Sequence, residues 1–277
     1  MRIDSHQHFW QYNPTDYIWM SEIHGVLKKD FLPEHLLPML RLEQVDGTIA
    51  VQARQMVEET DFLLQLAQQH DWIKGVVGWI PLCNSNVEQY LEQYAQEQKI
   101  VGFRHVLHDE PDPYFMLRNS FHNGINALSR YSKCYDLLIF EHHLPQTIQF
   151  VDKHPNVKMI VDHIAKPRIG REMDDSWEKS INELAKRNHV FCKLSGMVTE
   201  VRENTWDAEL LKPYFNIVLE AFGPQRLLFG SDWPVCLLQS NYSKWMNTVQ
   251  AFIAPLSECE QEDIMGNNAS KIYLQSI

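Results

Sequence analysis

The sequence lacks any apolar stretch long enough to cross a membrane. Its 277 residues contain no run approaching the roughly 18 consecutive apolar residues that a transmembrane helix needs. The opening residues, MRIDSHQHFW, also lack the apolar run of a secretory signal peptide. We therefore expect neither a membrane protein nor an exported one, and predict a cytoplasmic location.

Cysteines are few, odd in number and widely separated. None of the five stands in a C-x-x-C spacing, which excludes a recognisable disulfide framework and a cysteine-rich zinc site. We expect most of these thiols to be small buried apolar groups in a reducing compartment. The cysteines are Cys83, Cys134, Cys192, Cys236 and Cys259.

Positive charge is also scarce. The chain has 25 Lys and Arg residues against 36 Asp and Glu residues, a formal net charge of −11. Binding to nucleic acid depends mainly on clustered Lys and Arg that neutralise phosphates, so a nucleic-acid partner is not expected. We expect a small-molecule partner instead, and the sequence is compatible with a homo-oligomer.

No linker rich in Gly, Ser or Pro divides the chain, and its composition is that of an ordinary globular protein. What it does contain is a repeated alternation of short apolar runs and amphipathic segments, which is typical of βα units. Several runs are almost continuously apolar, as in a parallel sheet covered on both faces. The eight runs span residues 2–8, 47–53, 74–82, 100–107, 135–142, 157–163, 189–196 and 226–232.

Helices are predicted from apolar residues that recur on one face of each intervening segment. The predicted helices are 58–70, 84–95, 115–133, 145–153, 175–188, 208–222, 242–254 and 258–274. Eight strands with eight helices add up to a (β/α)8 barrel, which we expect to form one domain over residues 1–277.

A barrel enzyme carries its chemical groups at the carboxyl ends of its strands. Polar and ionisable residues do gather where the apolar runs end. They are His6-Gln7-His8, Gln52 with Arg54, Arg104-His105 with His108, Glu141-His142-His143, Asp162-His163 with Lys166, Lys193 with Ser195, and Asp232-Trp233. Because residues two apart on a strand share a face, His6 and His8 are predicted to point together into the barrel and to bind one cation.

Four ordered motifs carry a resemblance that spans about residues 1 to 275. They are IDSHQHFW at the start, GFRH near residue 102, DHIAKP near 162 and LFGSDWPV near 228. With them the chain resembles the amidohydrolase superfamily, and more narrowly the amidohydrolase-related group that contains sugar-lactone hydrolases such as L-fuconolactonases and L-rhamnonolactonases. The resemblance implies a distorted (β/α)8 barrel and hydrolysis of a sugar lactone to the aldonic acid.

The resemblance also implies site residues. His6, His8 and Asp232 match metal-ligand positions of the superfamily, and His163 matches its strand-six histidine. One divalent metal ion, with zinc preferred, is expected as an optional cofactor. Many binuclear members have a carboxylated lysine or a glutamate at the end of strand four, where this chain has Arg104-His105, so a two-metal site is not expected.

Lactone hydrolysis needs an activated water, stabilisation of the carbonyl oxygen and a proton for the leaving ring oxygen. Asp232 is predicted to be the general base, with Arg104 and His163 as catalytic residues beside it. The residues expected to bind the substrate are Gln52, Arg54, His105, Glu141, His142, Lys166 and Trp233. Neighbours on an ideal strand face opposite ways, so Arg104 against His105, and His142 against His143, stay open alternatives, with His142 preferred.

Other residues are predicted to be structural. Trp10, Trp19 and Trp79 are expected to pack in the core or at the rim, and His24 to lie on the surface. Two further functions stay open: a metal-dependent decarboxylase of the same superfamily, and a noncatalytic sugar-binding barrel.

Overall fold

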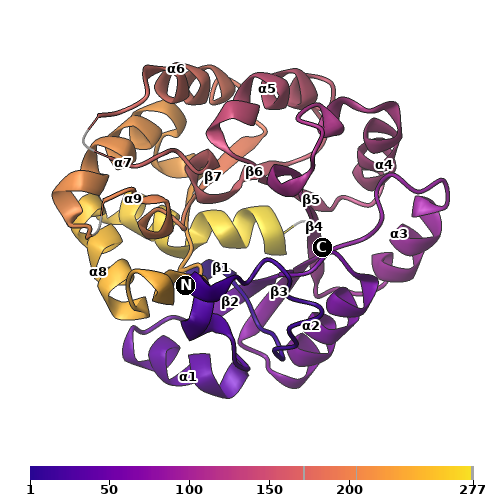
Figure 1. The fold of residues 1–277 in the computed structure, drawn as a ribbon, viewed down its shortest axis with the longest axis horizontal. Coiled ribbons are helices and arrows are strands. Elements are labelled where there is room, and N and C mark those ends of the chain that lie inside the picture. The colour runs from indigo at the N-terminus through magenta and orange to yellow at the C-terminus, as the bar shows by residue number, and fades with distance from the viewer. Residues whose placement is uncertain (171, 204, 276–277) are drawn as a thin grey trace.

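Eight parallel strands form one sheet in the order β1 to β8 in the computed structural model of the chain, which describes residues 1–170, 172–203 and 205–275 (Figure 1). The strands are β1 (Ile3–Gln7), β2 (Gly47–Val51), β3 (Ile73–Gly78), β4 (Ile100–Val106), β5 (Cys134–Leu138), β6 (Met159–Val161), β7 (Val190–Leu194) and β8 (Leu227–Phe229). The sheet closes just beyond the ends of β1 and β8, where His8 N donates to Trp233 O at 2.7 Å and Asp232 N donates to His6 O at 2.8 Å. The predicted single-domain (β/α)8 barrel is therefore confirmed.

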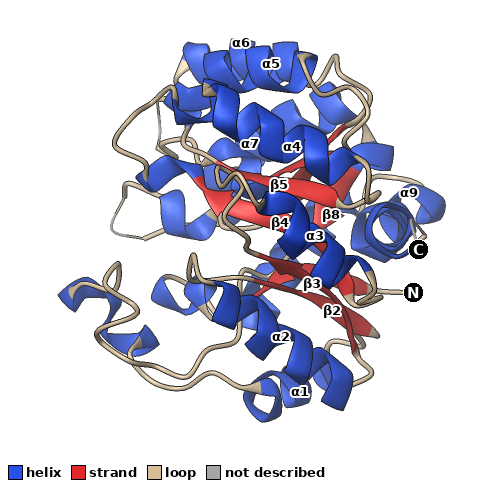
Figure 2. Ribbon diagram, turned by 90° about the vertical axis from the view of Figure 1, so that its right-hand side faces the viewer, coloured by secondary structure: helices blue, strands red, loops and turns tan. Residues whose placement is uncertain are grey.

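Helices surround the barrel and separate its strands in the sequence (Figures 1 and 2). They are α1 (Pro33–Leu42), α2 (Val57–Gln69), α3 (Val87–Ala95), α4 (Asn119–Ser129), α5 (Leu144–Asp152), α6 (Asp175–Leu184), α7 (Ala208–Phe222) and α8 (Tyr242–Ile253). Each presents buried apolar residues to the sheet, as in α7, where Leu211, Phe215, Val218 and Phe222 are buried. This spacing of three and four residues is the apolar stripe that predicted the helices.

Two helix predictions were wrong. No helix was predicted between the first two strands, yet α1 fills that position. Pro38 inside α1 removes one backbone donor and obscures the helical pattern. The expected helix over 115–133 is broken in two, a 3₁₀ turn at Phe115–Leu117 and then α4. Arg118 separates them with extended backbone angles of φ −65° and ψ 140°.

The C-terminal segment closes the amino end of the barrel. Helix α9 (Glu258–Glu262) continues through two π-helical turns, Asp263–Asn267 and Ser270–Leu274. Ile272 and Tyr273 pack with the inward-facing strand residues in one apolar cluster. Tyr273 also reaches up the barrel axis, where its hydroxyl donates to Asp136 Oδ1 at 2.8 Å.

The long connection from β1 to α1 covers part of the opposite end. It folds back on itself through a bridge in which Trp10 N donates to Phe31 O and Phe31 N donates to Trp10 O, both at 2.9 Å. A 3₁₀ helix at Glu22–Leu27 packs against another at Val235–Leu238 after β8. Within the described part of the chain, no helix combines the length and apolarity needed to cross a membrane.

Candidate active site

A cavity of about 420 Å³ opens at the carboxyl ends of the strands, and we call it the mouth cavity. It lies among the strand-end residues and the long connection after β1. The residues that line it include His8, Trp10, Trp19, His24, Arg104, His108, Phe140, His163, Lys166, Glu200 and Asp232. Five of these, His8, Arg104, His163, Lys166 and Asp232, are predicted site residues.

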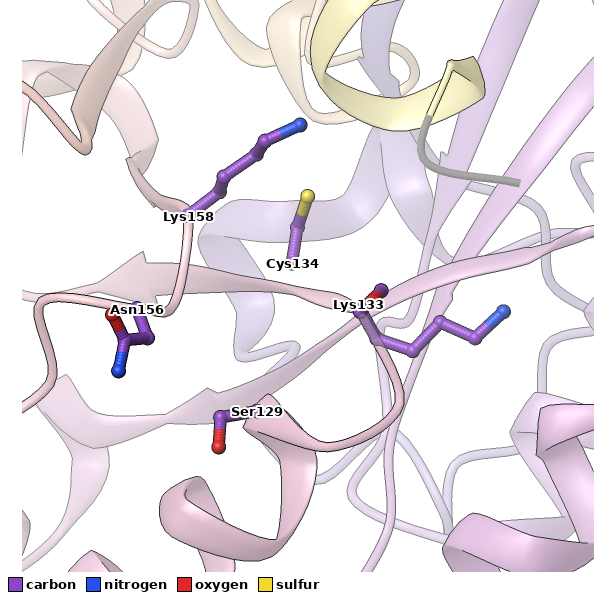
Figure 3. A pocket seen from close by; sticks show the side chains of 6 residues that line it. Ser129, Lys133, Cys134, Asn156 and Lys158 are labelled. Atoms are coloured by element: carbon purple, nitrogen blue, oxygen red, sulfur yellow. The ribbon is translucent and has the colours of Figure 1, made fainter.

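A second cavity, of about 270 Å³, lies at the amino ends of β5 and β6 (Figure 3). The side chains of Lys133 and Lys158 in its wall extend in different directions, and Lys133 Nζ already donates to Ile100 O at 2.6 Å. Burial raises the pKa of the Cys134 thiol there to about 12, so it is not a nucleophile at neutral pH. The mouth cavity is therefore the candidate active site.

His6, His8 and Asp232 meet at the floor of the mouth cavity. The two Nε2 atoms of His6 and His8 are 3.2 Å apart, as expected for residues on one face of β1 and its extension. Asp232 Oδ1 lies 3.3 Å from His8 Nε2 and 3.8 Å from His6 Nε2. All three side chains are buried, so the cluster is shielded from bulk water.

These residues fit one divalent ion. His8 Nδ1 donates to Val51 O at 2.7 Å, which leaves the Nε2 atom of His8 unprotonated and facing the cluster. The observed Nε2 separation of 3.2 Å also matches the roughly 3.3 Å expected for two imidazoles on one tetrahedral zinc ion with ligands at about 2 Å. Two imidazole nitrogens and one carboxylate are donors that zinc prefers.

A second possible ligand group, His6 with Asp162 and His163, is already neutralised. Asp162 Oδ2 lies 2.8 Å from Arg104 Nη1, and Asp162 Oδ1 lies 3.0 Å from Lys193 Nζ. Both carboxylate oxygens therefore face a buried cation of the protein. Among the described residues, the donor set suits one ion better than two.

His163 stands beside the cluster in an unusual backbone. Its Nε2 lies 3.9 Å from Asp232 Oδ1, and its Nδ1 lies 2.8 Å from Ser195 Oγ. The four residues from His163 to Lys166 all have positive φ, between 47° and 64°, which is rare for residues with a Cβ, and rarer still for the β-branched Ile164. Such strain is typical of functional positions.

Asp232 is ionised in this environment. Burial alone would raise its pKa, but the neighbouring His163 and His8 rings outweigh burial and hold the pKa of Asp232 below its usual value. Burial lowers the pKa of His163 well below its usual value, more strongly than Asp232 raises it. The site thus combines an anionic carboxylate with the neutral imidazoles of His6 and His163, a combination suited to accepting a proton.

Two cations reach the wall of the cavity. Arg104 lies on β4 with Nη1 3.2 Å from His6 Nε2, and its Nη2 donates to Gln52 O. Lys166 Nζ donates to Glu200 Oε1 at 2.8 Å and lies 5.8 Å from the centre of the Phe140 ring. Arg104 is held rigidly by these contacts, whereas Lys166 is part of an ion pair at the cavity wall.

Three predicted substrate-binding residues on the second and fourth strands do not line the mouth cavity. Gln52 is buried and donates through Nε2 to Arg104 O at 3.2 Å. Arg54 is held by ion pairs to Glu59 at 2.7 Å and Asp16 at 2.8 Å. His105 points to the outer side of the barrel, where its Nδ1 accepts from Trp79 Nε1 at 3.2 Å and its Nε2 donates to Glu110 at 2.6 Å. Because β4 is regular here, only Arg104 of the Arg104-His105 pair faces inward.

Three more predicted residues also lie elsewhere. Glu141 accepts from the backbone N of Arg168 at 2.9 Å and pairs with its side chain at 3.3 Å. His142 is exposed in the 3₁₀ turn Glu141–His143, while His143 is buried, and neither lines the cavity. Trp233 is buried against Phe31, behind the site. The chain turns immediately after β5 and β8, so the simple strand register does not extend to these positions.

Several cavity residues were not predicted to bind substrate. Trp19 and His24 come from the connection after β1 and were expected in packing or on the surface. His108, Phe140 and Glu200 follow β4, β5 and β7. His108 and Phe140 lie close to strand ends, a signal that points to the cavity edge, but nothing in the sequence places Trp19 or His24 there.

An eight-stranded parallel barrel with an ionised aspartate and a His-x-His pair at its mouth defines a (β/α)8-barrel enzyme with its chemistry at the strand ends. The chain belongs to the amidohydrolase family, whose profile, described as Amidohydrolase, matches residues 3–274. This family membership confirms the resemblance stated from the motifs.

Relatives of known name cover nearly the whole chain. An L-fucono-1,5-lactonase of Burkholderia multivorans is 39% identical over 99% of this chain and 96% of its own length. An L-fucono-1,5-lactonase of Burkholderia ambifaria is 32% identical over 98% of this chain and 95% of its own. A crystal structure of an amidohydrolase from Burkholderia multivorans with bound zinc is 38% identical, covers 99% of both chains and has a TM-score of 0.95.

Proposed function

We propose that this protein hydrolyses a sugar lactone of the L-fucono-1,5-lactone type to the aldonic acid, in the cytoplasm. Two relatives more than 30% identical over nearly the full length carry that activity in their names. The observation that carries the proposal is the ionised Asp232 carboxylate at the floor of the mouth cavity, 3.3 Å from His8 Nε2. A base at that place serves a hydrolytic reaction in which water attacks a carbonyl carbon.

Asp232 acts first as a general base and then as an acid. Its contacts with His6, His8 and His163 all involve Oδ1, which leaves Oδ2 to take the proton of water. The water oxygen bonds to the lactone carbonyl carbon, and the carbonyl π electrons move onto its oxygen. As that oxyanion collapses, the bond to the ring oxygen breaks, and the proton on Asp232 passes to the ring oxygen to give the open hydroxy acid.

His163 and Arg104 stabilise charge during this step. Arg104 contributes a fixed positive charge that does not need to reorganise, because its guanidinium is held by Asp162 and Gln52. His163, held by Ser195, stands 3.9 Å from the Asp232 oxygen and orients the carboxylate. Lys166 binds a substrate hydroxyl group at the cavity wall.

One divalent ion, with zinc preferred, would be held by His6, His8 and Asp232. When bound, it supplies Lewis-acid polarisation of the carbonyl oxygen and lowers the pKa of a nearby water.

The test is a hydrolysis assay with purified protein. L-fucono-1,5-lactone and L-rhamnono lactones are the substrates, each with added zinc, with a chelator and without protein, because lactones also hydrolyse spontaneously. Dihydroxybenzoate, assayed for carbon dioxide release, tests the decarboxylase alternative. We expect hydrolysis of the L-fucono lactone well above the spontaneous rate; no lactone hydrolysis by zinc-supplemented protein overturns the proposal.

Asp232→Asn tests the base directly. Loss of general-base catalysis lowers kcat by about 10²- to 10⁴-fold. Asp112→Asn is the matched control, because the Asp112 carboxylate pairs with Arg118 at 2.7 Å and does not line the mouth cavity. Equal activity of Asp232→Asn and wild type would remove Asp232 from the mechanism.

A further inference from the structure

We propose that Trp19 Nε1 and His108 Nδ1 recognise hydroxyl groups of the substrate, one as a hydrogen-bond donor and the other as an acceptor. This inference rests on the proposed lactone hydrolysis and extends it to specificity: the enzyme takes polyhydroxylated lactones rather than simple alkyl lactones. Both residues line the mouth cavity, and both atoms are buried without a hydrogen-bond partner among the described residues.

The indole N–H of Trp19 differs from most others in the described structure because it is buried and donates to no protein atom. Most other indole N–H groups donate to the protein. They are those of Trp10 to Lys29 O (2.9 Å), Trp79 to His105 Nδ1 (3.2 Å), Trp177 to Ile164 O (3.0 Å), Trp206 to Gln239 O (2.8 Å) and Trp245 to Gly230 O (2.9 Å). Trp233 also has a buried N–H without a partner in the described structure, but it lies outside the mouth cavity. Trp19 thus combines an unused donor with a place in the cavity wall.

The orientation of Trp19 is fixed by packing. Its ring meets Trp10 edge to face, with centroids 6.2 Å apart and planes at 87°. On another side it contacts the His24 ring at 5.7 Å, also close to edge on. A donor held in place before the substrate arrives loses little conformational freedom on binding, and therefore discriminates well.

His108 supplies the complementary acceptor. Its Nε2 lies 3.3 Å from Asp109 Oδ1, a contact that favours the tautomer with the ring proton on Nε2 and the lone pair on Nδ1. Burial, with help from the charges of Lys166 and Arg104, lowers the pKa of His108 to about 2, so the ring is neutral. The ring is also stacked on Phe140, with centroids 4.6 Å apart.

A hydroxyl group both donates and accepts, so the hydroxyls of a sugar lactone match this pair of atoms. Buried polar atoms without a partner are costly, and water or ligand hydroxyls remove that cost. A lactone without hydroxyl groups offers no partner to either atom and leaves both unpaired. The cavity therefore selects against such substrates.

The test measures coupling between the protein groups and the substrate hydroxyls. Trp19→Phe removes the donor, and His108→Gln removes the acceptor at the Nδ1 position. His108→Asn is the matched variant, because its amide oxygen stands near the place of Nδ1. Trp72→Phe is the control for the loss of an indole outside the cavity, and the melting temperature of every variant is recorded.

The substrates are the aldonolactone that the wild type hydrolyses, its monodeoxy analogues and δ-valerolactone, which has no hydroxyl groups. We expect Trp19→Phe and His108→Gln each to lower kcat/KM for the aldonolactone by about five- to ten-fold. For the wild type, loss of the recognised hydroxyl in one monodeoxy analogue should lower kcat/KM by a similar factor. In the variant that lacks the protein group for that hydroxyl, the same analogue should cause no further loss. His108→Asn should retain more activity than His108→Gln.

The outcomes separate this inference from the proposed function. If the enzyme hydrolyses lactones but the effects of the variant and of the deoxy analogue on kcat/KM are additive, the roles of Trp19 and His108 are overturned and the proposed function stands. The same holds if δ-valerolactone is hydrolysed as fast as the sugar lactone. Failure to hydrolyse any lactone overturns the proposed function itself.

Discussion

The imidazoles of His6 and His8 face each other with their Nε2 atoms 3.2 Å apart. Two unprotonated nitrogens at this distance repel each other unless a proton or a cation lies between them. His8 is committed to the unprotonated form at Nε2, because its Nδ1 proton is donated to Val51 O. Arg104 Nη1, which can only donate, lies 3.2 Å from His6 Nε2, so this nitrogen of His6 is an acceptor as well. A cation shared by the two imidazole nitrogens would remove the repulsion between them.

Replacing His8 by Ala should weaken zinc binding by more than roughly 100-fold, since even outer partners of metal ligands are worth 10- to 100-fold. The affinity is measured by competition with a chromophoric chelator, and zinc content by elemental analysis. His24→Ala is the control, because this imidazole lines the cavity outside the cluster. Equal zinc affinity in His8→Ala and wild type would contradict a zinc site at this pair.

Lys193 is predicted to be essential for stability. Its ammonium is fully buried, pairs with Asp136, and lies 3.0 Å from Asp162 Oδ1. Lys193→Met leaves these two carboxylates under-compensated, which should lower the free energy of unfolding by about 3–5 kcal/mol. Urea unfolding followed by circular dichroism measures the change.

The control for Lys193 is Lys186→Met, which removes an exposed partner of Glu183 and should cost no more than about 1 kcal/mol. Adding Asp136→Asn to Lys193→Met should recover part of the lost stability, because it removes one uncompensated charge. If Lys193→Met is as stable as Lys186→Met, the buried network does not support the barrel.

The strands could be predicted from sequence because their residues are buried on both faces and give continuous apolar runs. β2 (Gly47–Val51), for example, is buried at every position. The residues at which the strands end were predicted less accurately. The predicted strand 157–163 stops at Val161, because the backbone from His163 enters a left-handed turn that no apolar pattern encodes.

The candidate site was predictable where strand geometry alone decides it. His6 and His8 share a face of β1, so their meeting follows from their spacing. The position of Arg54 depends on Asp16, 38 residues away in the sequence, and the place of Trp19 depends on how a long connection folds. Such partners are set by tertiary packing, and the local sequence does not contain them.

Gly196 is predicted to be required for the position of His163. Its φ of +62° lies in the left-handed region, and a Cβ there would be 2.5 Å from His163 Nδ1. Gly196→Ala should therefore lower stability by at least about 1–2 kcal/mol from the backbone alone, and should lower kcat through displacement of His163.

Kinetics and thermal unfolding of Gly196→Ala are compared with those of Gly170→Ala, where an added Cβ has no neighbour within 4 Å. We expect the Gly170 variant to behave as the wild type. A Gly196→Ala enzyme with unchanged kcat would show that the His163 ring does not need its present position.

The stability of the protein should fall in acid partly because of His154. Its Nε2 lies 2.7 Å from His122 Nδ1 in a buried pair between α4 and the end of α5, and Lys153 Nζ lies 3.5 Å from the other nitrogen of His122. Burial, with the charges of His122 and Lys153, lowers the pKa of His154 from 6.5 to about 4. Between these pH values the unfolded chain binds a proton that the folded chain does not, so stability falls as the pH decreases through this window.

His154→Gln removes this titration while the amide keeps a polar atom near the place of Nε2. The loss of stability between pH 7 and pH 4.5, measured by urea unfolding at several pH values, should be smaller in His154→Gln than in the wild type. His142→Gln, an exposed histidine outside the pair, should leave the pH dependence unchanged. If His154→Gln loses as much stability as the wild type over this range, the folded protein takes up a proton at the His122–His154 pair as readily as the unfolded chain does.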